Sequence, residues 1–150
     1  MYYQMRVAEK SDEQAIIQFL QEANVGHEGI GTQGSKFIIL EENNKKIAAC
    51  LGLEELGDSR GILRSLVVSD KLNQGHIVSL FQSMQLLCDH ERIRTLYLVA
   101  NQQSSFEFLD VMGFKKTKNI PQAIHHSEHA AEALKSKGAE LMVKEMRDCG

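Results

Sequence analysis

The chain is poor in the residues that mark specialised architectures: its 150 residues include one proline, no tryptophan and three cysteines. The single proline argues against a long disordered linker. The cysteines (Cys50, Cys88 and Cys149) are odd in number and form no close pair, which predicts reduced thiols in a cytoplasmic protein rather than a disulfide framework. The first residues lack the apolar stretch of a secretory signal. No run approaches the ~18 apolar residues of a membrane span, so we expect no membrane association.

The sequence also lacks any cluster of positive charge. The 17 Lys and Arg residues are scattered along the chain, and they are outnumbered by 20 Asp and Glu residues, for a formal net charge of −3. Binding to a phosphate backbone requires a clustered basic surface, so nucleic acid is excluded as the expected partner. The remaining composition, 43% hydrophobic and 25% charged, is typical of a globular protein, and the length suits one domain over residues 1–150.

Strand-like and helix-like hydrophobic periods alternate along the chain. Strands are predicted at residues 3–9, 36–42, 47–56, 61–68, 95–99, 114–116 and 139–146, and helices at 12–23, 76–91, 104–112 and 122–129, the last with an alternative end at residue 134. The order β-α-β-β-β-α-β-α-β-(α)-β predicts an α+β (mixed α/β) domain around one twisted, mostly antiparallel sheet of six or seven strands.

Two helix ends and one turn are predicted from local chemistry. Ser11 and Gln14 have the spacing of a capping box at the start of the first helix. Gly113 is predicted to end the helix at 104–112 as its C-cap, since glycine adopts the left-handed conformation without strain. Residues 57–60 (Gly-Asp-Ser-Arg) are predicted to form the turn that joins strands 47–56 and 61–68.

The stretch from residue 53 to residue 114 is the most informative about function. A strand ends at Val68, a short polar loop covers residues 69–75, and a helix is predicted to begin at His76. The start of a helix presents unpaired N–H groups and the positive end of the helix dipole, so this junction is a candidate anion site. If strands 61–68 and 95–99 are parallel neighbours, a cofactor is expected where they diverge.

These segments resemble the acetyl-CoA motif of the GNAT N-acetyltransferases, a strand followed by R/Q-x-x-G-x-G/A and a helix. The motif corresponds here to Leu66-Val67-Val68-Ser69-Asp70-Lys71-Leu72-Asn73-Gln74-Gly75-His76. A second signature of that superfamily, a short helix ending in Gly-Phe, corresponds to residues 104–114. The runs at 53–68 and 121–128 resemble a small bacterial branch of arsenic-resistance and amino-acid N-acetyltransferase-like proteins.

The resemblance implies acetyl-CoA as cofactor and a set of residues that hold it. The backbone of Leu66, Val67 and Val68 would bind the pantetheine arm, Asn73, Gln74, Gly75 and His76 would donate N–H groups to the pyrophosphate, and Asn101 and Phe108 would flank the arm. Ordinary roles remain open for several of them: a capped helix start for the loop residues, a turn residue for Asn101 and a core side chain for Phe108.

Three features depart from the family pattern. The loop keeps one clear glycine, Gly75, its only cation is Lys71, and Leu109 stands where the family often has a tyrosine as general acid. Two functions therefore stay open. The first is an acetyl-CoA-dependent N-acetyltransferase in which the amine of a small molecule, such as an amino acid or an analogue, attacks directly. The second is a degenerate GNAT-fold module that binds CoA or a partner without catalysis. Relatives often dimerise, so a homodimer is a candidate state, but the sequence does not determine the oligomeric state.

Glu54 and Glu55 are the candidate general bases, since amine acetylation needs a carboxylate that accepts a proton. Adjacent strand residues face opposite sides, so at most one serves the site. The branch motif favours Glu54 as catalytic, and a solvent-facing acid is the alternative. Arg64 lies mid-strand between apolar neighbours, where a charge is costly unless paired. It either binds a substrate carboxylate or pairs with an internal acid such as Glu54.

The histidines are weaker candidates. His125 and His129 are four residues apart beside His126, but no cysteine or acid array completes a zinc-like set, so no metal is expected. His27, near the glycine-rich stretch at 26–35, is a candidate for the acceptor side of the site.

Overall fold

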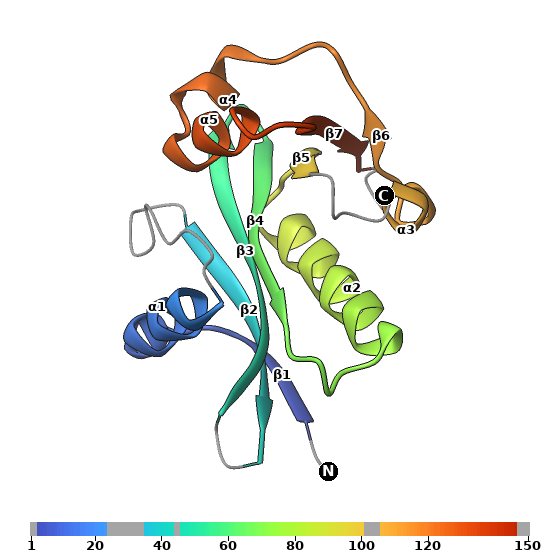
Figure 1. Ribbon diagram of the computed structural model, residues 1–150. Helices are drawn as coiled ribbons and strands as arrows, with labels where there is room; N and C mark the ends of the chain where they lie inside the picture. Colours follow the sequence, from blue (N-terminus) through green and yellow to red (C-terminus); the bar gives the residue numbers. More distant parts are fainter. Residues whose placement is uncertain (1–2, 24–34, 44–45, 101–105, 147–150) are drawn as a thin grey trace. The chain divides into compact units, whose positions relative to one another are not determined.

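The computed structural model describes residues 3–23, 35–43, 46–100 and 106–146 (Figure 1). Within these ranges seven strands form one sheet in the order β1-β2-β3-β4-β5-β7-β6. The elements in chain order are β1 (Tyr3–Val7), η1 (Lys10–Asp12), α1 (Glu13–Glu22), β2 (Ser35–Glu42), β3 (Ile47–Gly57), β4 (Arg60–Val68), α2 (Gln74–His90), β5 (Thr95–Ala100), α3 (Phe106–Val111), β6 (Lys115–Lys116), α4 (Gln122–His126), α5 (Glu128–Leu134) and β7 (Glu140–Glu145). The predicted α+β class is confirmed.

The described residues group into two compact units. Unit 1 comprises Met1–Leu53 and Ser65–Leu87, and unit 2 comprises Glu54–Arg64 and Cys88–Gly150. Strands β3 and β4 contribute residues to both units, since the chain crosses from one to the other within each of these strands.

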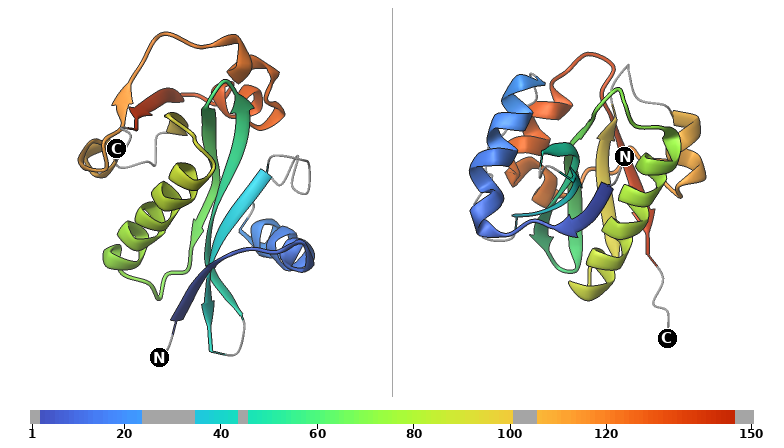
Figure 2. Two further views of the ribbon diagram at one scale, coloured as in Figure 1. Left: turned by 180° about the vertical axis from the view of Figure 1, so that it is seen from behind. Right: turned by 90° about the horizontal axis from the view of Figure 1, so that it is seen from below.

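In unit 1, helices α1 and α2 cover opposite faces of the strands (Figure 2). On the α1 side, buried residues from α1, β2 and β3 pack into one cluster: Ile16, Leu20, Phe37, Ile39, Ile47 and Cys50. Fully burying one of its isoleucine, leucine or phenylalanine side chains contributes about 1.5–3 kcal/mol. On the α2 side, the Ser83 hydroxyl donates to Met5 Sδ at 2.9 Å, and the Tyr3 ring meets the His76 ring edge-on at 5.1 Å.

The start of α1 differs from the prediction. Ser11 lies inside the 3-10 turn η1, and Asp12 stands at the N-cap of α1 without a side-chain capping bond. The predicted Ser11 capping box is therefore wrong. The Asp12 carboxylate accepts from the Glu9 N–H at 2.7 Å and from Arg6 Nη1 and Nη2 at 2.7 and 2.8 Å. Hydrogen bonds between two charged groups are about twice as strong as neutral ones, so Arg6 determines where this carboxylate lies.

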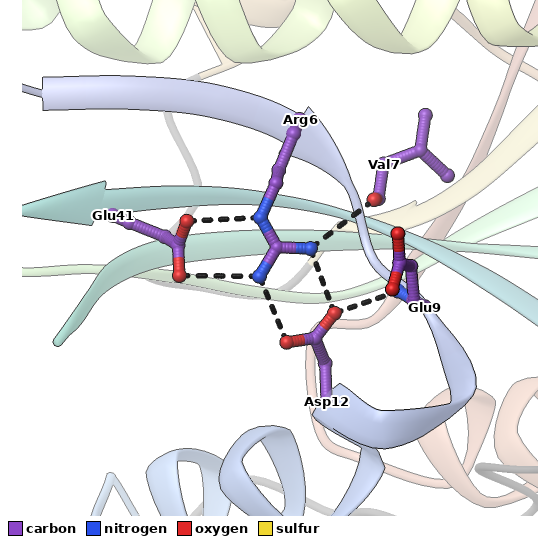
Figure 3. A network of polar contacts seen from close by, with 5 residues as sticks. All are labelled: Arg6, Val7, Glu9, Asp12 and Glu41. Atoms are coloured by element: carbon purple, nitrogen blue, oxygen red, sulfur yellow. Dashed lines mark hydrogen bonds and ion pairs between the residues drawn. The ribbon is translucent and has the colours of Figure 1, made fainter. Parts of the chain in front are cut away.

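Arg6 also binds the neighbouring strand (Figure 3). Its Nε and Nη2 atoms donate to the two oxygens of Glu41 at 2.9 and 3.1 Å. Arg6 of β1 thus links Glu41 of β2 to the turn that precedes α1. The Arg6 hydrogen bonds lower the pKa of Asp12 from its ordinary value of 3.8 to about 2, against the opposing effect of burial.

In unit 2, strand β5 has partners on both sides. It pairs in parallel with β4, where Arg60–Ile62 face Thr95–Tyr97, and antiparallel with β7 along its whole length. Strand β6 adds to the outer edge of β7, also antiparallel. Helices α4 and α5 pack on one face of these strands through a cluster of buried residues: Ile62, Tyr97, Ile124, Ala130 and Leu141.

Two predicted chain reversals in unit 2 are confirmed. Asp58 and Ser59 have φ of 54° and 60° in the turn between β3 and β4, as in the hairpin turns whose twist matches that of the strands. At the end of α3, Gly113 has φ of 98°. Its N–H donates to Asp110 O at 3.0 Å, and Phe114 N–H donates to Leu109 O at 2.9 Å. This Schellman pattern is what a C-cap glycine forms.

Candidate active site

The start of α2 is fixed by a reciprocal pair of hydrogen bonds in unit 1. The helix begins at Gln74, earlier than the predicted His76. The Asn73 side-chain oxygen accepts from the His76 N–H at 3.2 Å, and His76 Nδ1 accepts from the Asn73 N–H at 3.1 Å. This is a capping box in which histidine takes the place of the usual Glu or Gln. The N–H groups of Asn73 and His76 are therefore used inside the cap.

Gln74 and Gly75 are the first two helical residues, and both are exposed. N–H groups at these positions precede the first intrahelical acceptor and lie at the positive end of the helix dipole. A Cβ on Gly75 would lie 3.1 Å from the Asn73 side-chain oxygen, so the glycine leaves room for the capping amide. In the loop before the helix, Lys71 is exposed, and the Leu72 N–H donates to Ser69 O at 3.0 Å.

The last residues of β4 have different surroundings. Leu66 is exposed, Val67 packs against the α1 side of the unit 1 core, and Val68 is half-buried. The Ser69 N–H that follows donates to Ala48 O of β3 at 2.8 Å, so the pairing of these strands continues to the start of the loop.

In unit 2, β4 and β5 are parallel neighbours, which meets the condition set for a cofactor where they diverge. Their register covers Arg60–Ile62 and Thr95–Tyr97, although β5 continues to Ala100. The last residues of β5 remain paired with β7 on their other side. Within the described chain, the backbone groups of Leu98–Ala100 on the β4 side lie outside the parallel ladder. Such backbone edges bind extended ligand chains through main-chain hydrogen bonds.

Glu54 lies half-buried on β3 and accepts a hydrogen bond from the Ser127 hydroxyl, 2.9 Å from Oγ to Oε1. Ser127 stands between α4 and α5 and is 3% exposed. The neighbouring Glu55 lies on the other side of the strand, where its charge helps to raise the pKa of the Cys88 thiol. The two candidate bases therefore have different environments, as strand alternation requires.

Arg64 is 3% exposed, and Arg64 and Ser127 are the buried polar side chains of the described residues. Arg64 follows Ile62 by two positions on β4. Ile62 packs with Ile124 and Ala130 of α4 and α5. The buried Arg64 and Glu54, the hydrogen-bond partner of Ser127, therefore lie on the neighbouring strands β4 and β3 within unit 2.

The remaining candidates have ordinary environments or lie outside the described chain. On α3, Phe108 is half-buried and Leu109 is 6% exposed, so the position where the family often has a tyrosine holds a core side chain. Asn101 and His27, and the side chain of His129, lie outside the described residues. In the part of the chain that the structure describes, no cluster of three or more His, Cys, Asp or Glu side chains is arranged for a metal. No described helix has the length and apolar character needed to cross a membrane.

Sequence reasoning missed the role of Ser127. The predicted helix at 122–129 is two helices that meet at this residue, α4 ending at His126 and α5 beginning at Glu128. The only sequence signal for Ser127 was its place in the run Pro121–Glu128, which resembles the small bacterial N-acetyltransferase branch. That resemblance predicted no structural role for Ser127.

Both described cysteines are buried thiols, so we expect them to be unreactive in the folded protein. Burial raises the pKa of the Cys50 thiol and of the Cys88 thiol to about 12 each. Because the thiolate is the nucleophile, neither should react with iodoacetamide at pH 8. Peptide mass spectrometry after brief labelling checks this, with protein in 6 M guanidinium as the control in which both become labelled. Rapid native labelling of either residue would contradict the burial.

No family model matches the chain. Among curated proteins, YwlB of Bacillus subtilis (strain 168) is 47% identical over 144 residues, which cover 96% of this chain and 98% of YwlB. The chain belongs to the YwlB family. YwlB itself is described as uncharacterized, so membership of the YwlB family does not indicate an activity.

Solved structures identify the fold of this YwlB family member. A GNAT-family acetyltransferase of Staphylococcus aureus Mu50 has a TM-score of 0.74 at 15% identity, covering 97% of this chain and 100% of its own. N-acetylglutamate synthase of Neisseria gonorrhoeae, solved with coenzyme A and N-acetyl-glutamate, has a TM-score of 0.73 at 17% identity over 98% of this chain and 36% of its own. The fold is the GNAT fold, which confirms the expectation from the sequence.

Proposed function

We propose that this chain is an acetyl-CoA-dependent N-acetyltransferase whose acceptor is a small amine that carries a carboxylate, such as an amino acid or an analogue. The observation that carries the proposal is the Glu54 carboxylate of β3, bonded by Ser127, together with the buried Arg64 of the neighbouring strand β4, all within unit 2. It is supported by the GNAT fold and by the synthase of the same fold that was solved with coenzyme A and an acetylated amino acid.

The residues at the start of α2 fit a diphosphate group. Gln74 and Gly75 offer main-chain N–H groups at the positive end of a 17-residue helix, and both are exposed. Lys71 adds one exposed cation nearby in the chain. We assign the pyrophosphate to these donors, with the Asn73–His76 cap holding the turn in shape. The backbone of Leu66–Val68 is assigned to the pantetheine arm, and the role of Phe108 stays a prediction. Bound acetyl-CoA supplies an acetyl group activated as a thioester.

Glu54 is the proposed general base. An amino group is protonated at neutral pH and attacks only after it loses a proton. The Glu54 carboxylate takes this proton, directly or through a water molecule, so the N–H bond breaks as an O–H bond forms. Oε1 already accepts from Ser127 at 2.9 Å, so Oε2 is the oxygen assigned to the proton.

Arg64 is the proposed partner of the acceptor's carboxylate. A guanidinium presents a planar fork of donors that matches a carboxylate bidentately. Its 3% exposure removes competition from bulk water, which strengthens such a contact. This assignment limits the acceptor to anionic amines. Polyamines, which lack a carboxylate, are then poor acceptors.

A non-catalytic GNAT-fold module is the second candidate. It is favoured by Leu109, a core side chain at the position of the family's usual acid, and by the capping bonds that occupy two of the predicted N–H donors. Turnover decides between the two functions, because release of CoA that depends on an added amine excludes the second. We place either function in the cytoplasm, and a homodimer remains a prediction.

Acetyl-CoA binding tests the cofactor assignment. We expect calorimetry to detect binding to the parent protein and Gln74→Glu to weaken it about tenfold or more, because a carboxylate at the helix start repels the diphosphate. An acidic residue in the first turn stabilises a helix, so this variant should fold at least as well as the parent. Gln74→Ala, which removes the same side chain without adding charge, should bind like the parent.

Two results would count against this assignment. No heat at millimolar acetyl-CoA would remove the cofactor from the proposal altogether. Equal affinity of Gln74→Glu and the parent would show that the start of α2 does not hold the diphosphate. Activity is then followed by thiol release from acetyl-CoA with the twenty L-amino acids as acceptors and spermidine as the amine without a carboxylate.

A further inference from the structure

Ser127 is held by four hydrogen bonds at the junction of α4 and α5. Its N–H donates to Ile124 O at 3.2 Å and its carbonyl accepts from the Ala131 N–H at 2.9 Å. Its hydroxyl accepts from the Ala130 N–H at 3.2 Å and donates to Glu54 Oε1 at 2.9 Å. Ile124 and Ala130 are fully buried beside it. The hydroxyl oxygen is therefore held by the backbone of unit 2 rather than by its own flexible side chain.

The capping bond decides where the hydroxyl proton points. A serine hydroxyl has one proton and two acceptor lone pairs. Because the Ala130 N–H occupies the acceptor side of the oxygen, the proton is directed to Glu54 Oε1. Oε1 is consequently an acceptor, and a proton taken up by this carboxylate is directed to Oε2. A helix cap by itself needs only an acceptor, so the donation to Glu54 is a second use of the same group.

We propose that Ser127 is a positioning residue for the acetyl transfer: it holds the Glu54 carboxylate so that Oε2 faces the acceptor amine. This inference rests on the proposed function. The physical reason for this role is preorganisation: a base that is already oriented needs no reorientation as the proton is transferred. Ser127 acts only through Glu54 and does not touch the acceptor.

The test is a double-mutant cycle on kcat, measured by CoA release with the best L-amino-acid acceptor. Ser127→Ala should lower kcat about tenfold with little change in KM for acetyl-CoA, since a misoriented base typically loses one to two orders of magnitude. Ser127→Thr keeps a hydroxyl that can both cap and donate, so it should recover most of the parental kcat. In a Glu54→Gln background, where no base remains to be positioned, Ser127→Ala should cause no further loss.

Loss of the α5 cap is the competing explanation, and the cycle separates it. Ser127→Ala will also lower the thermal midpoint because it removes a helix cap. If that were its only effect, kcat would fall by the same factor in the parent and in the Glu54→Gln background. Circular dichroism at the assay temperature confirms that every variant compared is folded.

Each outcome supports or overturns the inference. The inference is supported if the parent is active and Ser127→Ala lowers kcat only in the background that keeps Glu54. An active parent whose kcat is unchanged in Ser127→Ala, or falls equally in both backgrounds, overturns the positioning role and leaves the acetyltransferase intact. A parent that binds no acetyl-CoA and releases no CoA with any acceptor overturns the proposed function and, with it, the role of Ser127.

Discussion

Replacing Glu54 with glutamine is expected to lower kcat by about 10²–10⁴, the usual contribution of a general base. Glutamine has nearly the same shape, and its side-chain carbonyl can still accept the Ser127 hydrogen bond that Oε1 accepts at 2.9 Å. The change removes proton acceptance and little else, so stability and acetyl-CoA affinity should stay near those of the parent. Thiol release with an amino-acid acceptor measures the effect.

Glu55→Gln is the matched control for this variant. Glu55 is the adjacent carboxylate on β3, and its charge acts on Cys88 rather than on Ser127. We expect its kcat to remain within about twofold of the parent, since it belongs to the other side of the strand. If the two variants lost activity equally, or if Glu54→Gln remained fully active, Glu54 would not be the base.

Removing the Arg6 side chain is expected to give the largest loss of stability among the charged residues described. Arg6→Leu leaves Asp12 and Glu41, whose side chains are 17% and 13% exposed, without the cation they share. Breaking a buried ion pair costs about 3–5 kcal/mol, and exposed pairs contribute about 0–1 kcal/mol. For this half-buried network we expect the free energy of unfolding to fall by about 2–3 kcal/mol. Urea denaturation at pH 7 measures it.

The pH dependence of the same network has a definite sign. The folded pKa of Asp12 is lowered from 3.8 to about 2, chiefly by its hydrogen bonds with Arg6. The folded protein therefore binds this proton more weakly than the unfolded chain does. The stabilisation is fully present above pH 4 and is lost as the pH falls from about 4 to about 2; at about 1.4 kcal/mol per pKa unit it amounts to about 2 kcal/mol.

Asp12→Asn should remove this component and flatten the decline in stability between pH 4 and pH 2. Asp110→Asn is the control, because Asp110 pairs with Lys115 at the surface, where the two side chains are 60% and 68% exposed. That exposed pair should contribute less than about 1 kcal/mol. Equal effects of the two substitutions would show that burial of the Arg6 network adds nothing.

Most of the secondary structure was predicted because its causes are local. Six of the seven strands follow from alternating or continuous apolar runs, β6 (Lys115–Lys116) being the exception, and each observed strand ends within two residues of its prediction. Gly113 was identified as a C-cap because the left-handed conformation excludes most other residues, and its φ of 98° agrees. A periodic pattern and a turn residue carry this information without reference to the rest of the chain.

The predictions that were wrong or incomplete involve partners far away in the sequence. Ser11 had the capping-box spacing to Gln14, but Arg6 holds Asp12 together with Glu41, 35 residues from Arg6, and this network determines how the chain enters α1. The break between α4 and α5 was missed because Ser127, which caps α5, also bonds Glu54, 73 residues away. No window of local sequence contains both members of such a pair.

The sequence by itself determined the α+β class, the order of the elements, the resemblance to GNAT proteins, and Glu54 and Arg64 as the residues to examine. Local periodicity and motif spacing suffice for these, since each depends on neighbours within a few turns or one strand. Only the tertiary structure decided that Glu54 and Glu55 differ in environment, that Arg64 is buried, and that Ser127 bonds the Glu54 carboxylate. Those facts depend on which strands pair and which helices cover them, and such long-range packing is set by the whole chain.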